Sequence, residues 1–261
     1  MNRPRFASAA LLALLAIGAQ ACSDDAPLPP TAPTPSVGSV TIVPGTDWLV
    51  LGSETTFSAF VTMTSGSGQT MEATWQSNNA SVAEVSSRGV VRALSPGRAS
   101  ITATASGVSA TRSVRVAPDF TATWSGRAVV VSCVNLVGSG CSSDPPGSSS
   151  NVGAVLAQAR DNVSGAIQVR AISVGVDGVV AESGVVTLEG LSEDRSGDRV
   201  DHRRRWRDLR LTPDASGAHL TGQGVLESEW LNVDQSVRIR TAVTYEIAAD
   251  RASSLPTPTI R

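Results

Sequence analysis

The residues best suited to chemistry lie in one run, DHRRRWRDLRL, at positions 201–211. Guanidinium groups around an indole can hold phosphate, nucleic acid or an anionic head group. The run supplies a candidate binding patch made of these residues: Arg203, Arg204, Arg205, Trp206 and Arg207. Between positions 193 and 210, however, seven arginines face five acidic residues, and the whole chain has a formal net charge of −2. A nucleic-acid surface would leave a larger positive excess, so we expect no nucleic-acid partner.

Alternation along the run predicts which way the patch faces. In a strand, the three odd-numbered arginines share a face with Leu209 and Leu211, and Trp206 lies on the other face. Because the leucines mark the inward side, Trp206 is predicted to face solvent with arginines over its ring, and the earlier residues to lie in a loop or at a strand end. Two interpretations stay open: a solvated strand whose charges pair with one another, and a contact for an anionic glycan or lipopolysaccharide.

The sequence lacks the usual catalytic constellations. All 21 basic residues are arginines, which excludes lysine Schiff bases and the phosphate-loop lysine. The two histidines, His202 and His219, lie in a charged run and beside a turn, and neither context indicates a general base. No nucleophile elbow, paired-histidine metal motif or calcium loop occurs. We therefore predict a protein that is not an enzyme and has no metal or cofactor. An enzyme would need a cleft that gathers a histidine with carboxylates or a serine.

Cys133 and Cys141 are separated by seven residues, including two glycines. In an oxidising compartment such a pair favours one disulfide that clamps a loop. The alternatives are a metal site, which would need more ligands than this sequence offers, and a redox site, which would favour a Cys-x-x-Cys spacing.

The first 21 residues predict that the chain is exported from the cytoplasm. A short basic head precedes an apolar run from Ala7 to Ala21, which is short for a membrane span but suits a secretory signal. The run ends in AIGAQACSDD, which resembles the signal of bacterial lipoproteins, although Ala19 stands where that family usually has leucine. The resemblance implies a signal peptide over 1–21, a lipid on Cys22 that anchors the chain to a membrane, and sorting to the outer membrane or cell surface of a Gram-negative bacterium. The alternative is ordinary secretion with cleavage near Cys22.

Two segments are predicted to lie outside any folded domain. Residues 22–36 combine the lipidated cysteine with a tether that has five prolines, which favour extended polyproline geometry. Residues 250–261 are predicted to be a flexible tail.

Short alternating segments begin at Val37 and predict about seven strands in eighty residues, as in a sandwich. A set of motifs in fixed order adds to this pattern: Trp75, Ser77, Asn79, then Val82, Ala83, Val85, then Gly89, Val91, Ala93, then Pro96, Gly97, Ala99 and Ile101 to Ala103. They resemble a bacterial immunoglobulin-like domain of group 2 over residues 37–117. The resemblance implies display or adhesion at the cell surface, or a spacer, and no catalysis. Trp75 is predicted to anchor the core and Asn78 and Asn79 to form a turn; the alternative is a carbohydrate contact.

A second β-rich domain is predicted over residues 119–249, where strand-like segments are separated by polar or Gly-rich turns. The fold class is therefore all-β: an immunoglobulin-like sandwich followed by an antiparallel meander that closes into a small up-and-down barrel. Trp124-Ser125-Gly126 and repeated Ser/Thr-Gly strand starts are loosely similar to lipocalin-like and avidin-like barrels, although the lipocalin glycine before the tryptophan is absent. A flattened sandwich is the alternative.

These features together predict a cell-envelope lipoprotein with a non-catalytic display, adhesion or binding role. Its expected partners are the membrane, through the lipid, and a cell-surface glycan, lipid or protein. The alternative function is a carrier of a small hydrophobic ligand, which requires a hollow apolar interior in the second domain.

Overall fold

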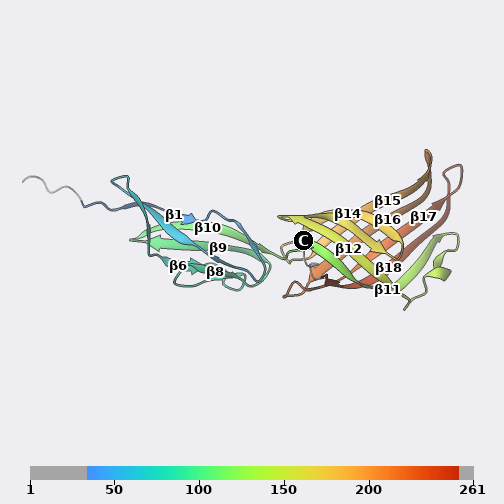
Figure 1. Ribbon diagram of the computed structural model, residues 1–261, viewed down its shortest axis with the longest axis horizontal. Coiled ribbons are helices and arrows are strands. Elements are labelled where there is room, and N and C mark those ends of the chain that lie inside the picture. The colour runs from blue at the N-terminus through green and yellow to red at the C-terminus, as the bar shows by residue number, and fades with distance from the viewer. Residues whose placement is uncertain (1–33, 253–261) are drawn as a thin grey trace, which may run out of the picture. The chain divides into compact units, whose positions relative to one another are not determined.

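The computed structural model describes residues 34–252, and these are almost entirely β-structure (Figure 1). The predicted signal peptide, Cys22, most of the tether and residues 253–261 of the predicted tail lie outside the described residues. The described chain has eighteen strands, one short 3-10 helix and no α-helix, which confirms the all-β fold class. Over the same residues, no helix has the length and apolar character that a membrane crossing needs.

The first domain consists of ten strands in three small sheets. The strands are β1 (Val37–Val43), β2 (Trp48–Val50), β3 (Glu54–Thr56), β4 (Ser58–Met63), β5 (Gly68–Met71), β6 (Thr74–Ser77), β7 (Ala83–Val85), β8 (Val90–Ala93), β9 (Gly97–Ala105) and β10 (Val108–Ala117). The sheet orders are β1-β4-β5, β2-β10-β9-β6 and β3-β8-β7. All pairs are antiparallel except β2 with β10, which are parallel.

The core of this domain follows the predicted alternation. Every second residue of β9 is buried, and Phe57 and Ile101 are almost completely enclosed. Trp75 is half-buried and packs against this core, as predicted. Gly89 shows why the turn beside it needs glycine: its φ is +79°, and a Cβ there would lie 2.2 Å from the carbonyl oxygen of Phe57. Asn78 accepts a hydrogen bond from the Ser100 amide, which agrees with the turn role.

Arg115, on β10, is a buried charge with an exposed fraction of 4%. Its guanidinium donates to the carbonyl oxygen of Ala181 at 2.8 Å and to that of Val116 at 3.0 Å. The charge is paired with Asp161, whose Oδ1 lies 3.2 Å from Nε. A buried guanidinium needs such a set of acceptors, because an unpaired charge away from water is very costly.

The second domain is a closed antiparallel barrel of eight strands, which confirms the predicted meander over the flattened sandwich. The strands are β11 (Ala122–Val137), β12 (Ser149–Ala159), β13 (Asn162–Val169), β14 (Ile172–Val180), β15 (Val186–Ser196), β16 (Arg199–Pro213), β17 (His219–Leu231) and β18 (Val237–Arg251). The barrel closes where β11 pairs with β18, and the single 3-10 helix, η1 (Cys141–Ser143), lies between β11 and β12.

The interior of the barrel is filled by its own side chains. One continuous cluster of buried residues includes both Trp124 and Trp206, with Leu188, Leu209 and Tyr245 among their neighbours in the cluster. Each of these five residues is at most 4% exposed. A barrel of eight strands is just wide enough for such filling. The predicted carrier function needs a hollow apolar interior, and this cluster occupies that place.

One end of the barrel is fixed by an arginine stacked on a tryptophan. The guanidinium carbon of Arg251 lies 5.0 Å from the centre of the Trp124 ring. Arg251 also donates to the carbonyl oxygen of Gly217 at 2.9 Å, and the Trp124 indole donates to that of Phe120 at 3.0 Å. This contact joins the last strand to the first where the barrel closes. The arginine contact predicted for Trp206 is not found among the described residues.

The eight strands differ in length, and five of them continue past the closed part at the other end. Pairing of β11 with β12 stops at Val129 and Ser149, and pairing of β14 with β15 starts at Asp177 and Glu189. Beyond these points β15, β16, β17, β18 and β11 remain paired with one another in that order. We call this part the five-stranded extension; in Figure 1 its strands continue toward the right-hand end of the barrel.

Candidate binding surface on the barrel extension

The predicted patch lies within strand β16 and not in a loop. Arg203 and Arg205 lie opposite Glu229 and Glu227 of β17, on the outer face of the sheet. Trp206 lies opposite Leu226, on the inner face, and is 1% exposed. The five predicted residues are therefore divided between two faces: Arg203, Arg205 and Arg207 point outward, and Arg204 and Trp206 point inward. The prediction that Trp206 faces solvent is wrong.

A bulge at Asp208 explains the error. The pairing of β16 with β17 shifts between Arg207 and Arg210, and Asp208 has a φ of +47°. An extra residue in one strand reverses the alternation beyond it, so Trp206, Leu209 and Leu211 all point into the barrel. The sequence holds only a weak signal for this bulge, since aspartate adopts positive φ more readily than most residues.

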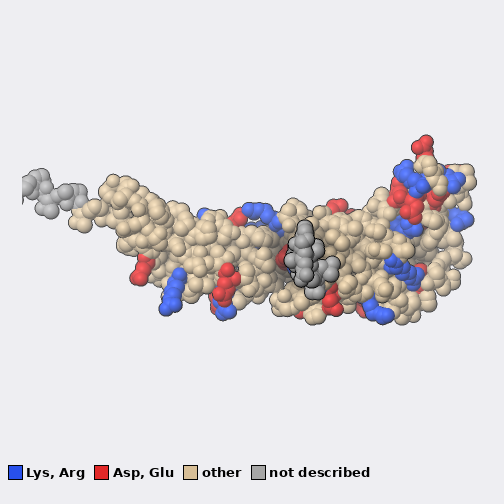
Figure 2. All heavy atoms as spheres, viewed as in Figure 1, with Lys and Arg blue, Asp and Glu red and all other residues tan. Residues whose placement is uncertain are grey.

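The outward arginines belong to a network that we call the arginine–glutamate belt, which crosses β15 to β18. Its members are Arg203, Arg205, Arg207, Arg240, Glu193, Glu227 and Glu229. Arg203 contacts Glu193 at 2.9 Å and Glu229 at 3.3 Å. Figure 2 shows positive and negative atoms gathered together at this end of the barrel. Of the two alternatives left open by the sequence, the strand whose charges pair with one another describes most of this surface.

The same glutamates also pair with arginines further along the belt. Glu227 accepts contacts from Arg207 at 2.9 Å and from Arg240 at 3.3 Å. Arg240 reaches Glu229 at 3.2 Å. Each of these carboxylates thus serves two arginines, and both are only 15% exposed in their side chains.

Arg205 differs from the other arginines of the belt, because it forms no ion pair with any residue between positions 34 and 252. It is exposed and borders two shallow hollows. The smaller, of about 70 Å³, is shared with Arg203, Arg240 and the two glutamates of β17. The larger, of about 330 Å³, is bordered by Asp177, Glu189 and Leu191. A guanidinium without a protein partner beside a hollow is available to an anion from outside.

Arginines lower the pKa of two carboxylates at this end of the barrel, Glu193 and Asp194. Hydrogen bonds from Arg203 and Arg195 lower the pKa of Glu193. On the inner face, the hydrogen bond from Arg204, 2.5 Å from Asp194, lowers the pKa of that aspartate. Acids held below their usual pKa by arginines are poor proton donors and weak bases near neutral pH, so this surface suits binding better than acid–base chemistry.

The two histidines are not brought together. His202 faces Asp194 at 3.6 Å and packs edge-on against Trp230, with ring centres 5.8 Å apart. His219 begins β17 at the other end of that strand and pairs with Asp250 at 2.5 Å, which raises the pKa of the imidazole. Among the described residues, no group of three or more His, Cys, Asp or Glu side chains is placed to hold a metal ion.

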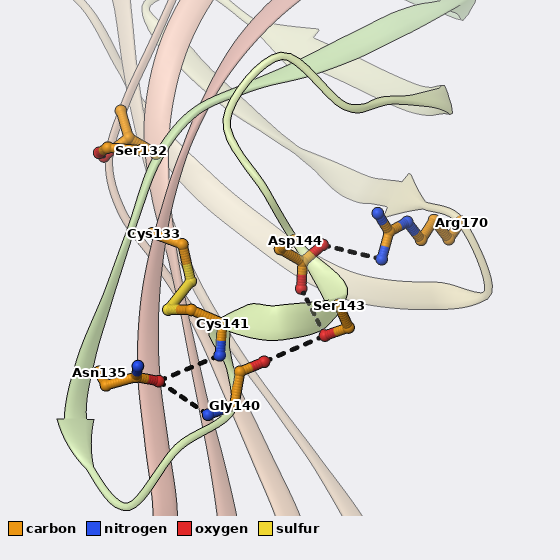
Figure 3. The surroundings of a disulfide bond; sticks show 9 residues. Ser132, Cys133, Asn135, Gly140, Cys141, Ser143, Asp144 and Arg170 are labelled. Atoms are coloured by element: carbon orange, nitrogen blue, oxygen red, sulfur yellow. Dashed lines mark hydrogen bonds and ion pairs between the residues drawn. A yellow bond between two sulfur atoms is a disulfide. The ribbon is translucent and has the colours of Figure 1, made fainter.

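The cysteine pair forms the predicted disulfide. Cys133 on β11 and Cys141 on η1 are bonded, and the loop between them is also held by Asn135 (Figure 3). The Asn135 side-chain oxygen accepts hydrogen bonds from the amides of Gly140 at 2.7 Å and Cys141 at 3.0 Å. Further along, Asp144 forms an ion pair with Arg170 at 2.8 Å. The loop is thereby tied both to β11 and to the turn between β13 and β14.

Comparison with known proteins identifies the first domain. Residues 36–116 match the family described as bacterial Ig-like domain (group 2). These residues are a group 2 Ig-like domain. The match leaves the barrel unassigned, and no curated protein matches the chain. Among solved structures, domains 5-6 of the S-layer protein SbsC share 12% identity with this chain, over 81% of it and 98% of the other, with a TM-score of 0.31.

The Ig-like domain fits a non-catalytic role at the cell surface. Domains of this kind are typically not catalytic. On the barrel, the belt around Arg205 is the candidate surface for specific recognition.

Proposed function

We propose that this chain is an exported, lipid-anchored protein of the bacterial cell envelope, and that its barrel is a non-catalytic module that binds anionic glycan. The lipoprotein-like signal supports the anchor, and the Ig-like domain supports the location. In this proposal the lipid on Cys22 holds the chain at the outer membrane or cell surface, and the Ig-like domain serves as a spacer that presents the barrel.

The observation that carries the glycan proposal is Arg205. It is the exposed arginine of the belt that no described carboxylate neutralises, and it lies beside Leu191, which is 48% exposed. A guanidinium can bind a carboxylate, sulfate or phosphate group with two hydrogen bonds, and an apolar neighbour can contact the face of a sugar ring. The paired arginines around it would fix the position of that ring without adding much affinity.

A glycan array tests this role. The full chain is probed against carboxylated, sulfated and phosphorylated oligosaccharides, including lipopolysaccharide, beside variants Arg205→Ser and Arg127→Ser. Arg127 is an exposed, outward-facing arginine on β11 of the same barrel and serves as the matched control. We expect Arg205→Ser to weaken binding of an anionic glycan about tenfold, because one charge-assisted contact is lost. Equal binding by all three proteins would contradict the role of Arg205, and no binding by any of them would contradict the glycan role.

The anchor has a separate test. Substitution Cys22→Ala should move the protein from the membrane fraction to the soluble fraction of cells, because the lipid provides the membrane affinity. Mass spectrometry of the N-terminal peptide would show the diacylglycerol on the natural protein. Membrane association that is unchanged in the variant would contradict the proposal.

A further inference from the structure

The last part of β11 has an open backbone edge. Residues 131–137 pair with β18, while the side that faces β12 has its last contacts at Val130, with Gly147 and Ser148. In an antiparallel pair, alternate residues direct their amide and carbonyl groups away from the partner strand. Within the described residues these groups of 131–137 have no strand to bind, so this edge can accept one.

Four of the five exposed side chains along this edge are apolar, and the fifth is Asn135, which accepts hydrogen bonds from the amides of Gly140 and Cys141. Val131, Val134, Leu136 and Val137 are 42%, 52%, 48% and 41% exposed. No charged residue occurs from position 128 to position 143. Protein edges are normally protected against strand addition by charges, prolines or short length. Over these seven residues the β11 edge has no charge and no proline, although its pairing with β18 is bulged between Val130 and Ser132 and between Asn135 and Val137.

The other free edge of the five-stranded extension shows the normal protection. Residues 190–196 of β15 are not paired with β14, and they include Glu193, Asp194 and Arg195. Charged side chains on that edge oppose pairing with a second chain. The two edges belong to one sheet, so the absence of charge on β11 is a local property of that strand.

We propose that the β11 edge binds a second copy of this chain, with residues 131–137 of the two copies paired antiparallel about a two-fold axis near Val134. In that register Val134 meets its equivalent at the axis, within the regular stretch 132–135 that lies between the two bulges of β11. An uncharged segment is complementary to itself, because no like charges meet when it pairs with its own copy. A two-fold contact also uses both open edges at once, so the assembly closes as a dimer. This inference is independent of the glycan proposal.

The contact is a strand addition and is small. Seven paired residues with four exposed apolar side chains fall at the low end of interface sizes, which corresponds to a weak and reversible dimer. We therefore expect association in the micromolar range or above.

Sedimentation equilibrium of the full chain, from about 1 to 500 µM, tests the dimer. The chain carries Cys22→Ser, so that a lipid cannot drive association. We expect a monomer–dimer equilibrium, which Val134→Lys weakens at least tenfold because two lysines would meet at the axis. Val155→Lys is the matched control: Val155 is 61% exposed on β12, and its strand is paired on both sides.

Hydrogen exchange distinguishes pairing of the β11 edges from nonspecific association of the chains. As concentration rises, amides of 131–137 should gain protection, while those of 190–196 on β15 should not change. A monomer at every concentration would overturn the proposal, and so would equal weakening by Val134→Lys and Val155→Lys or protection that appears elsewhere. Both lysines replace exposed side chains, so circular dichroism should show both variants folded.

Discussion

The closed part of the barrel and the five-stranded extension are continuous strands with different chemistry. In the closed part, inward residues such as Trp124 and Leu188 are apolar and fully buried. In the extension, the inward residues include Asp194, His202 and Arg204, which are polar and partly exposed. A closed ring of strands shields its inward side chains from water, whereas water reaches the inward face of the extension. Inward residues therefore have to be apolar only in the closed part.

The closed part can supply stability, and the extension can supply recognition. Burial of apolar surface stabilises the closed part at about 25 cal/mol per Å². Ion pairs at the surface of the extension contribute about 0–1 kcal/mol each. The extension can therefore vary its charges and edges for binding at small cost to the fold.

The largest expected difference between the two parts comes from their tryptophans. Trp206→Ala should reduce the free energy of unfolding of the barrel by about 3–5 kcal/mol, because it leaves a cavity in a filled core. Trp230→Ala in the extension should cost about 1 kcal/mol or less, since that ring is only half-buried. Hydrogen exchange of barrel amides in the full chain would measure both. Equal costs would show that the extension is packed as firmly as the closed part.

The disulfide is the next test, because it ties the extension to its loop. The double variant Cys133→Ser, Cys141→Ser should lose roughly 2–3 kcal/mol of stability, because the unfolded chain gains the conformational entropy that a closed loop of this length denies it. Urea unfolding of the oxidised protein and the variant would measure the loss. A loss confined to exchange protection of residues 131–148 would show that the bond stabilises only the extension.

Tyr245 tests whether the closed part stays dry. Burial raises the pKa of its phenol to about 12, from about 10 in the unfolded chain. The fold thus favours the neutral phenol, so its stability is complete below pH 10 and falls as the pH rises toward 12, by at most about 3 kcal/mol. Thermal unfolding at pH 9 and pH 11.5 should show a larger loss for the natural protein than for Tyr245→Phe. The same loss in both would mean that water reaches the ring.

The belt gives the smallest expected effect. Arg203→Ser removes contacts with Glu193 and Glu229 but should change the free energy of unfolding by less than about 1 kcal/mol, because these groups remain partly solvated. The residual effect should shrink in 0.5 M salt. Chemical denaturation at low and high salt would check this. A larger, salt-insensitive loss would place the belt within the structural core of the extension.

Much of the architecture was predictable from local patterns. The ordered motifs around Trp75 predicted the Ig-like domain, because each motif has a local role: Trp75 packs against the core and Gly89 supplies a positive φ at a turn. The spacing of Cys133 and Cys141 predicted the disulfide, and alternation with turn signals predicted the meander and its closure.

The orientation of the candidate patch was not predictable. Alternation assigns faces only while a strand stays regular, and the bulge at Asp208 placed Trp206 inside the barrel. The ion pairs of the belt could not be predicted either, because Glu227, Glu229 and Arg240 lie on strands up to 37 positions away from Arg203.

The sequence by itself determined the all-β class, the Ig-like domain, the disulfide and the near-neutral charge of the arginine run, since each depends on residues close together in the chain. Only the tertiary structure decided that the barrel is filled, that Arg205 is the belt arginine without an ion pair among residues 34–252, and that β11 has an uncharged open edge. These properties depend on where each strand stops pairing with its neighbours, and that is set by the whole barrel.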